Sequence, residues 1–389
     1  MARFIAFYLP QYHPTSQNDE WWGKGFTEWT NVAKAKPLFR GHKQPHIPAD
    51  LGFYDLRLPE VREAQVELAK EAGIEGFMYW HYWFGNGKRI LERIFDEVLA
   101  SGKPDFPFCL GWANESWFNK SWTNKSSFAK NPLLLEQIYS LEDYEKHFYA
   151  VLPAFKDSRY IKVDGKPLFY VYQPLYMPNP KEFIDLWRSL AEKNSLPGIH
   201  FVGMTSNTSF REAGAQKGKG KVIIPRTDAA SSYYQSIIDL GFDAVNSRGG
   251  ARAIIKSTGR LAFFIKVGIE KVFKIHRFEK HDQRKINKNL FVEEDKWENV
   301  YPTILPNWDR SPRAGKNASM HTHATPEVFQ EVAERAIEVV KDKDPEHQII
   351  FIQSWNEWGE GNYMEPDLEY GKGYINALRK AINNKNNGK

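Results

Sequence analysis

Residues 348–361 read QIIFIQSWNEWGEG, and this segment decides the fold class of the chain. The apolar, β-branched run over 349–353 predicts a buried strand. A cluster of polar and aromatic residues follows at its carboxyl end and contains two carboxyls, Glu357 and Glu360. Two acids three residues apart, set among tryptophan and glycine where a buried strand ends, indicate a reactive site. The plain alternative is a solvated turn that carries two incidental acids.

The same pattern, a short apolar run followed by a helical stretch, recurs along the chain. Strands are expected over 3–9, 74–84, 107–112, 167–172, 200–204, 242–246, 300–305 and 349–353. Helices are expected over 57–72, 90–100, 141–151, 181–192, 325–341 and 373–383, where apolar residues recur at helical spacing. Eight strands that alternate with helices predict an α/β fold, a single (β/α)8 TIM barrel with long βα loops.

A doubly wound sheet would give a similar alternation of strands and helices. Two observations favour the barrel instead. No glycine-rich phosphate turn follows any expected strand, and polar and aromatic clusters follow several of them, including strands 1, 2, 3, 7 and 8. In a barrel all these strand ends converge on one mouth.

Residues 1–389 are expected to form one catalytic domain, since no repeat or low-complexity linker divides them. Residues 256–296 are expected to be a basic insertion after strand 6. Within it, residues 260–288 interleave apolar residues with Lys and Arg, so we expect either a core-packed insertion or a peripheral contact with an anionic membrane.

Composition excludes several classes of protein. A single cysteine, Cys109, rules out an intrachain disulfide framework and a multi-cysteine metal site. The net charge of +5 is mild, and no base-reading motif is recognisable, so no nucleic-acid partner is expected. No cofactor and no metal site are expected. The first apolar run is too short for a signal peptide, which predicts a cytoplasmic protein, with the inner-membrane surface as an alternative location.

The two acids suit hydrolysis of a glycosidic bond, which needs one carboxyl to protonate the leaving oxygen and another as base or nucleophile. Aromatic faces stack on sugar rings, and polar side chains bind hydroxyls. The candidate substrate-binding residues follow strands 1, 2, 3, 7 and 8: Tyr8, Gln11, Tyr12, His13, Trp22, Glu28, Trp29, His81, Trp83, Trp112, Asn114, Glu115, Trp308, Asp309, Trp355 and Asn356.

For some of these candidates the sequence leaves the orientation or the role of the side chain open. Side chains alternate along a strand, so either His81 and Trp83 or Trp80 and Tyr82 face the barrel interior. Glu115 is the main rival carboxylate to the Glu357 and Glu360 pair. Asp309 is expected to bind hydroxyls or to pair with Arg310 or Arg313.

Several motifs together resemble a known family. They are FYLPQYHP at 7–14, WGKGFTEWTNV at 22–32, PHIP at 45–48 with LGFYD at 51–55, WANESW at 112–117 and WNEWGEG at 355–361. The chain is similar to WbsX-type proteins of surface-polysaccharide gene clusters, which are related to glycoside hydrolase family 99, the endo-acting α-mannosidases and α-mannanases. The resemblance covers nearly the whole chain.

The resemblance implies a (β/α)8 barrel that acts on an α-linked, mannose-like oligo- or polysaccharide with retention of configuration. In the implied route a carboxylate deprotonates the sugar's own 2-hydroxyl and a 1,2-anhydro intermediate forms. Glu357 then corresponds to the base and Glu360 to the acid. Such a pair must face a cavity, and a buried ion pair at either acid would contradict the assignment.

Two further functions stay open. WbsX-type proteins are also described as glycosyltransferases, so transfer or transglycosylation in O-antigen or capsule biosynthesis is the first alternative, with a lipid-linked glycan as a candidate substrate. A nucleotide-sugar enzyme often carries an Asp-x-Asp metal motif, and the one such sequence, 342–344, is expected on a solvated surface. A non-catalytic glycan-binding barrel is the second alternative.

Overall fold

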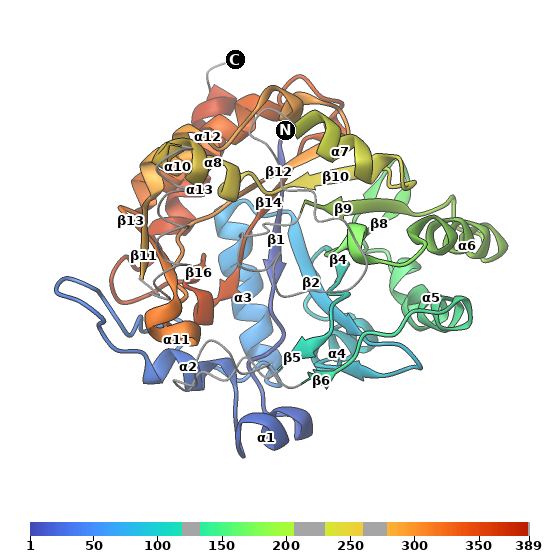
Figure 1. The fold of residues 1–389 in the computed structure, drawn as a ribbon, viewed down its shortest axis with the longest axis horizontal. Coiled ribbons are helices and arrows are strands. Elements are labelled where there is room, and N and C mark those ends of the chain that lie inside the picture. The colour runs from blue at the N-terminus through green and yellow to red at the C-terminus, as the bar shows by residue number, and fades with distance from the viewer. Residues whose placement is uncertain (119–132, 206–229, 260–277, 388–389) are drawn as a thin grey trace, which may run out of the picture.

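The structure is a computed structural model that describes residues 1–118, 133–205, 230–259 and 278–387. Eight parallel strands form its centre and close into a barrel because β1 pairs with both β2 and β14 (Figure 1). The barrel strands are β1 (Arg3–Tyr8), β2 (Gly76–Trp83), β4 (Phe108–Trp112), β8 (Lys166–Val171), β9 (His200–Met204), β10 (Ala244–Ser247), β12 (Val300–Ile304) and β14 (Ile349–Ile352). The eight predicted strands and the predicted barrel are therefore confirmed.

A helix follows each barrel strand and packs outside it, so the strands are covered on all sides (Figure 1). These helices are α3 (Pro59–Ala72), α4 (Arg93–Ser101), α5 (Leu141–Phe155), α6 (Pro180–Lys193), α7 (Ala230–Ile238), α8 (Gly250–Thr258), α12 (Pro326–Val340) and α13 (Gly373–Asn387). The sequence predicted six of them and did not predict α7 or α8.

Shorter elements lie mainly in the loops. They are α1 (Ser16–Trp22), α2 (Glu28–Lys34), β3 (Arg89–Ile90), β5 (Trp117–Phe118), β6 (Leu133–Leu135), β7 (Lys162–Val163), η1 (Pro174–Tyr176), β11 (Glu279–Asp282), α10 (Gln283–Lys288), η2 (Glu293–Lys296), α11 (Ser311–Ala314), η3 (Gly315–Asn317), β13 (Ser319–Thr322), η4 (Pro345–His347), β15 (Asn356–Glu357), η5 (Trp358–Glu360) and β16 (Asn362–Tyr363). The helices α1, α2 and α11 gather near the lower edge of Figure 1. The helices α1 and α2 follow the carboxyl end of β1, and α11 follows the carboxyl end of β12. This edge therefore belongs to the mouth of the barrel.

Aromatic rings fill the inside of the barrel. Phe7 lies 5.3 Å from Trp80, 5.5 Å from Tyr170 and 5.5 Å from Phe351, measured between ring centroids. The Tyr170 hydroxyl donates a 2.9 Å hydrogen bond to Asn246. The interior is thus a packed core, as in other barrels of this class, and Trp80 rather than His81 faces it.

The expected insertion at 256–296 is only partly described, because residues 260–277 lie outside the described ranges. In the described part, β11 pairs in parallel with β13, which belongs to the loop after β12. The predicted membrane segment at 260–288 falls mostly on residues that the structure does not describe. Among the described helices, none combines the length and apolar character that crossing a membrane requires.

Candidate functional site

The loop after β14 forms a small hairpin at the barrel mouth. Asn356 pairs with Tyr363 and Glu357 with Asn362 in the antiparallel β15–β16 ladder. Gly361 turns the chain with a φ of +60°, a left-handed conformation that glycine adopts without strain. A Cβ added there would lie 2.7 Å from the Asp309 backbone nitrogen, so the turn packs directly on the loop after β12.

Two of the predicted substrate binders, Tyr12 and Asn356, fix this hairpin instead. The Asn356 side chain accepts a 2.8 Å hydrogen bond from the Leu9 N–H and donates a 3.1 Å bond to the Leu9 carbonyl. The Tyr12 hydroxyl donates to the Asn356 carbonyl at 2.5 Å and accepts from the Trp358 N–H at 3.0 Å. Tyr12 and Asn356 are fully buried, so they position the hairpin and present no surface to a sugar.

A buried carboxyl, Glu365, also holds the hairpin in place through Trp358. It accepts hydrogen bonds from the Tyr54 hydroxyl at 2.9 Å, the Gln65 amide at 2.6 Å and the Trp358 indole at 2.6 Å. Burial raises the pKa of Glu365 to about 7, although these donors act in the opposite direction. No motif in the sequence distinguished this residue.

Arg313 on α11 joins the two predicted catalytic acids to a third carboxylate. Its Nε lies 3.0 Å from Glu28 Oε2, and one terminal nitrogen lies 3.1 Å from Glu360 Oε1. The other terminal nitrogen pairs with Glu357 Oε1. Arg310 adds a second cation, with its Nε 3.2 Å from Glu360 Oε1.

These charges drive the two acids apart in proton affinity. Burial raises the pKa of Glu357 to about 8, helped by the negative charges of Glu360 and Glu28 and opposed by Arg313. Burial also raises the pKa of Glu360, but Arg310 and Arg313 outweigh it and the pKa ends below its ordinary value. When Glu357 is protonated, the negative charges of Glu28 and Glu360 balance the positive charges of Arg310 and Arg313.

The expectation that neither acid would be held in a buried ion pair was wrong. Arg313 contacts both, and its side chain is 15% exposed. The physical reason is electrostatic, because three carboxylates brought together away from water need a cation to stay there. The ion pair therefore contradicts the assignment of Glu357 and Glu360 as an unpaired proton donor and acceptor. What still favours a proton-transfer role is that the two acids lie together at the mouth and that the Glu360 side chain keeps 18% of its surface exposed.

Glu28, another predicted sugar contact, is buried against the same turn. A Cβ added to Gly359 would lie 2.8 Å from Arg313 Nε and nearer still to Glu28 Oε2. The Glu28–Arg313 ion pair therefore fills the space beside this glycine. Its neighbour Trp29 donates a 2.7 Å hydrogen bond from Nε1 to the Tyr54 carbonyl and packs on Trp358.

An aromatic cluster forms one side of the mouth. Trp22 lies 5.1 Å from Phe26 and 6.3 Å from Trp117, and Trp117 lies 5.3 Å from Tyr82. The charge of Glu357 acts on the Tyr82 hydroxyl, whose pKa is raised well above its ordinary value, mainly by burial. Trp21 contacts both Trp22 and Trp117. The prediction named only Trp22 of this group, although the alternation of strand 2 had left Tyr82 open.

His81 and Trp83 face the other way, toward helix α5. His81 Nε2 lies 2.8 Å from His147 Nε2, and Trp83 Nε1 donates to Asp143 at 2.9 Å. His147 also stacks on Trp83 with ring centroids 4.7 Å apart. Burial lowers the pKa of His81 to about 3. The alternation of β2 therefore places Trp80 and Tyr82 inward, and His81 and Trp83 lie against α5 rather than at the mouth.

Three more predicted binders point toward the helices. Tyr8 donates a 2.7 Å hydrogen bond to Gln65 on α3, and Trp112 donates a 2.8 Å bond to the Trp83 carbonyl. Trp355 is fully buried, 5.4 Å from Phe77. Their large rings pack between the barrel and its helices, which a pattern of aromatic residues at strand ends cannot distinguish from a sugar platform.

Asn114 and Asp309 link loops. Asn114 exchanges hydrogen bonds of 2.7 and 3.1 Å with the Gln173 backbone. Asp309 accepts from His42 at 2.8 Å and from Gln44 at 2.7 Å, rather than pairing with Arg310 or Arg313. These bonds lower the pKa of Asp309 although burial acts to raise it.

The remaining candidates lie around the mouth with different degrees of exposure. Gln11 is buried, and its carbonyl accepts a 3.3 Å hydrogen bond from the Glu28 N–H. His13 is buried, which lowers its pKa to about 4. Trp308 donates a 3.1 Å bond to Ser319. Glu115 is half-buried, and its charge acts on the hydroxyls of Tyr82 and Tyr139.

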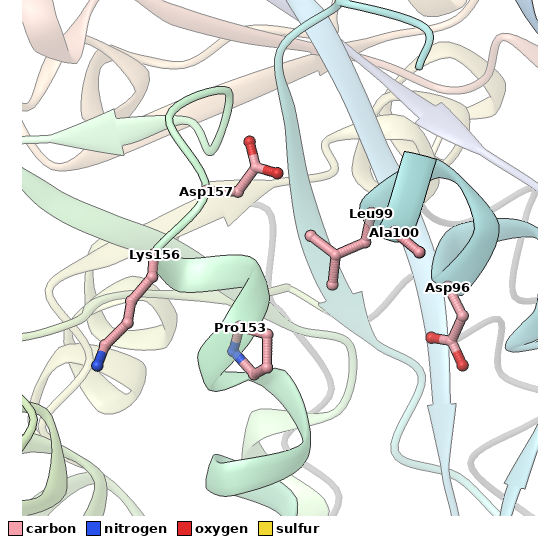
Figure 2. Close-up of a pocket in the computed structure, with 6 residues that line it drawn as sticks. All are labelled: Asp96, Leu99, Ala100, Pro153, Lys156 and Asp157. Carbon is pink, nitrogen blue, oxygen red and sulfur yellow. The ribbon is translucent and has the colours of Figure 1, made fainter. Parts of the chain in front are cut away.

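A hollow of about 480 Å³ lies elsewhere, between α4 and α5 (Figure 2). It is lined by Asp96, Leu99, Ala100, Pro153, Lys156 and Asp157. These residues lie at the carboxyl ends of the two helices, which lead back to the beginnings of the next strands. The hollow is therefore at the end of the barrel opposite the acids. Over the described ranges, no group of three or more His, Cys, Asp or Glu could hold a metal ion.

Comparison with known proteins identifies relatives over the whole chain. Two proteins of Xanthomonas campestris pv. campestris, both named "Uncharacterized protein WxcX", are 33% identical over 383 residues and 32% over 382. Each match covers 98% of this chain and 50% of the relative, so the chain spans about half the length of these curated relatives.

Solved structures share the fold. The GH99 endo-alpha-mannosidase from Bacteroides thetaiotaomicron has a TM-score of 0.54 at 15% identity, over 99% of this chain and 98% of that one. Its complex with BIS-TRIS-propane has a TM-score of 0.56 at 14% identity, over 99% and 97%. A "Glycoside hydrolase-like protein" has a TM-score of 0.55 at 14% identity, over 98% and 93%. At these identities the likeness shows the fold alone.

A family profile with the description "Glycosyltransferase WbsX" matches residues 4–378, nearly the whole chain. The resemblance drawn from the sequence motifs is thus confirmed. The chain belongs to the WbsX family, described as glycosyltransferases, and folds as a (β/α)8 barrel of the kind seen in GH99 endo-alpha-mannosidase.

Proposed function

We propose that this chain is a retaining glycosidase that cleaves an α-linked, mannose-like oligo- or polysaccharide at the barrel mouth. Glu357 and Glu360 transfer the protons. The observation that carries the proposal is the pair itself, two neighbouring carboxyls at the carboxyl end of β14 that share one arginine and differ in proton affinity. Acids this close titrate as a unit rather than independently, and the raised pKa of Glu357 beside the lowered pKa of Glu360 favours a form in which the unit keeps one proton.

One proton is what the reaction needs. In the first step Glu357 accepts the proton of the sugar 2-hydroxyl while O2 bonds to C1, and Glu360 donates its proton to the leaving glycosidic oxygen. In the second step a water oxygen bonds to C1 as the C1–O2 bond breaks. Glu360 takes a proton from that water, and Glu357 returns its proton to O2. A mannose-like substrate suits this route because its 2-hydroxyl lies opposite the α-linked leaving group.

The roles of the two acids follow the family resemblance. Without substrate, the shared proton rests on Glu357, so the reactive form is the one in which it has moved to Glu360. The high proton affinity of Glu357 makes it a stronger base than an ordinary carboxylate, and a sugar hydroxyl is a weak acid. Tyr82 and Trp117 beside the pair supply an aromatic face for a sugar ring.

Transfer is the second candidate function, and the family description favours it. The same pair would perform transglycosylation if an acceptor hydroxyl replaced water in the second step. A metal-dependent nucleotide-sugar reaction has less support. Lys343, in the middle of the Asp-x-Asp sequence, is buried and donates to the Val300 carbonyl at the amino end of β12. A lipid-linked glycan and a membrane contact through residues 260–288 remain part of this proposal.

The test is turnover of α-mannosidic oligosaccharides by wild type, E357Q and E360Q, with E67Q on the exposed face of α3 as a matched control. We expect each site variant to lose about 100-fold or more in kcat. An aryl glycoside with a good leaving group should restore much of the E360Q activity, because that leaving group needs no proton. Full activity in both variants overturns the proposal, and product only with a nucleotide sugar favours transfer.

Two binding measurements complete this test. A glycan that binds wild type without turnover would make the chain a non-catalytic binding barrel. Co-sedimentation with anionic vesicles should occur if residues 260–288 contact a membrane, and its absence would overturn that part of the proposal.

A further inference from the structure

We propose that Glu28 is a positioning residue that holds Arg313 in the one orientation in which its guanidinium contacts Glu357 and Glu360 together. Glu28 acts through Arg313 and touches no substrate. The inference rests on the proposed function, since it assigns to Glu28 and Arg313 the task of keeping the two acids as one shared-proton pair.

The geometry of the guanidinium carries the argument. The Nε of Arg313 faces Glu28 at 3.0 Å, and its two terminal nitrogens face Glu360 and Glu357. A guanidinium is planar, so fixing its Nε edge also fixes the directions of the other two nitrogens. A lysine could not replace it, because one ammonium group cannot contact three carboxylates placed around a plane.

Glu28 is itself held in place. It is the first residue of α2, its N–H donates to the Gln11 carbonyl at 3.3 Å, and it is 4% exposed. Gly359, in the turn between the two acids, lies against both Glu28 and Arg313 and leaves no room for a Cβ. The turn and the ion pair therefore pack directly on each other, and no sugar fits between them.

Other charged and titratable groups face the pair, and none of them replaces Glu28. Tyr12 and Tyr82 face Glu357, and burial keeps both hydroxyls neutral by raising their pKa values. Arg310 and Arg248 act on Glu360. Loss of Glu28 should therefore act on the pKa of Glu357 in two opposed ways. Removal of the nearby negative charge lowers this pKa, and release of Arg313 from its orientation raises it, because the contact with Glu357 is loosened.

The test is a pH titration by 13C NMR of protein labelled at the glutamate side-chain carboxyls, without substrate. The signals of the pair are assigned from their loss in E357Q and E360Q. In E28Q the lost charge and the loosened Arg313 contact should partly cancel, so the pKa of Glu357 should fall less than it does when Glu28 is replaced in a protein that lacks Arg313. E97Q is the matched control, because Glu97 is bound by Arg62 and Arg93 on the outer wall, and it should leave Glu357 unchanged. A fall in E28Q as large as the fall that the same substitution produces without Arg313 overturns the inference.

A double-mutant cycle shows whether Glu28 acts through Arg313. R313K alone should raise the pKa of Glu357, since a close donor is lost. In the R313K background, E28Q should lower the pKa of Glu357 through direct charge alone, whereas in wild type the loosened Arg313 contact should offset at least half of that fall. Equal falls in the two backgrounds would mean that Glu28 acts by direct charge alone. Because no reading depends on turnover, these results are independent of whether E357Q and E360Q retain activity.

Discussion

The Tyr12 hydroxyl donates a hydrogen bond of 2.5 Å to the carbonyl oxygen of Asn356, the residue immediately before Glu357. The same hydroxyl accepts from the N–H of Trp358, the residue immediately after it. One side chain from the loop after β1 therefore holds the backbone on both sides of the proposed base. The position of Glu357 is set by residues more than 300 positions away in the sequence.

Y12F should destabilise the protein because it leaves the Asn356 carbonyl and the Trp358 N–H buried without a partner. The expected loss in the free energy of unfolding is about 1–3 kcal/mol. Urea denaturation measures it, with Y149F on the half-exposed surface of α5 as control. Equal stability of Y12F and wild type would show that the hairpin does not depend on this hydroxyl.

E365Q should change how stability depends on pH. In the folded protein the pKa of Glu365 is about 7, above the ordinary 4.5 of a glutamate. Between these values the folded state binds more protons than the unfolded state, so this group lowers the free energy of unfolding as pH rises from about 4.5 to 7. The slope for one proton is at most about 1.4 kcal/mol per pH unit.

Removing Glu365 should therefore flatten that slope, measured by urea denaturation at several pH values from about 4.5 to 8. E67Q, an exposed glutamate on α3, is the matched control. Identical slopes for E365Q and wild type would contradict the raised pKa of Glu365.

H81Q should change how the free energy of unfolding depends on pH in the acid range. Burial lowers the pKa of His81 to about 3, against an ordinary 6.5. Between these values the unfolded state binds more protons, so the free energy of unfolding falls as pH falls below about 6.5. H81Q should reduce this fall in the free energy of unfolding at acid pH, even if the substitution also destabilises the packing at neutral pH. H323Q is the control, and because His323 is half-exposed it should leave the loss of stability at acid pH unchanged. If H81Q loses as much free energy of unfolding at acid pH as wild type does, the account is contradicted.

The sequence predicts the fold well because strand and helix formation here depends on local patterns. The run at 349–353 corresponds to β14, and the capped, Pro-initiated run at 325–341 corresponds to α12. The helices α7 and α8 had no such signals. Ala230–Ile238 begins with small, polar residues, and Gly250–Thr258 begins with a glycine that follows another glycine. Their helical state depends on packing against the barrel more than on propensity.

The site is harder to predict because it depends on which side of each strand faces inward and on contacts distant in sequence. The residues 80–83 read WHYW, so either alternating set could stack on a sugar, and only the register places His81 against His147 of α5. Arg313 was considered only as a partner for Asp309. Three buried acids at one mouth do require a cation, but the sequence does not show that Glu28 joins Glu357 and Glu360.

The most direct test of the central claim is a crystal structure of E360Q soaked with an α-mannosidic oligosaccharide. We expect a sugar ring at the barrel mouth with its 2-hydroxyl within about 3 Å of Glu357 and its glycosidic oxygen at a similar distance from the amide that replaces the Glu360 carboxyl. Arg313 should still contact Glu357. A sugar that binds with its 2-hydroxyl turned away from Glu357, or one found only outside the mouth, would contradict the account.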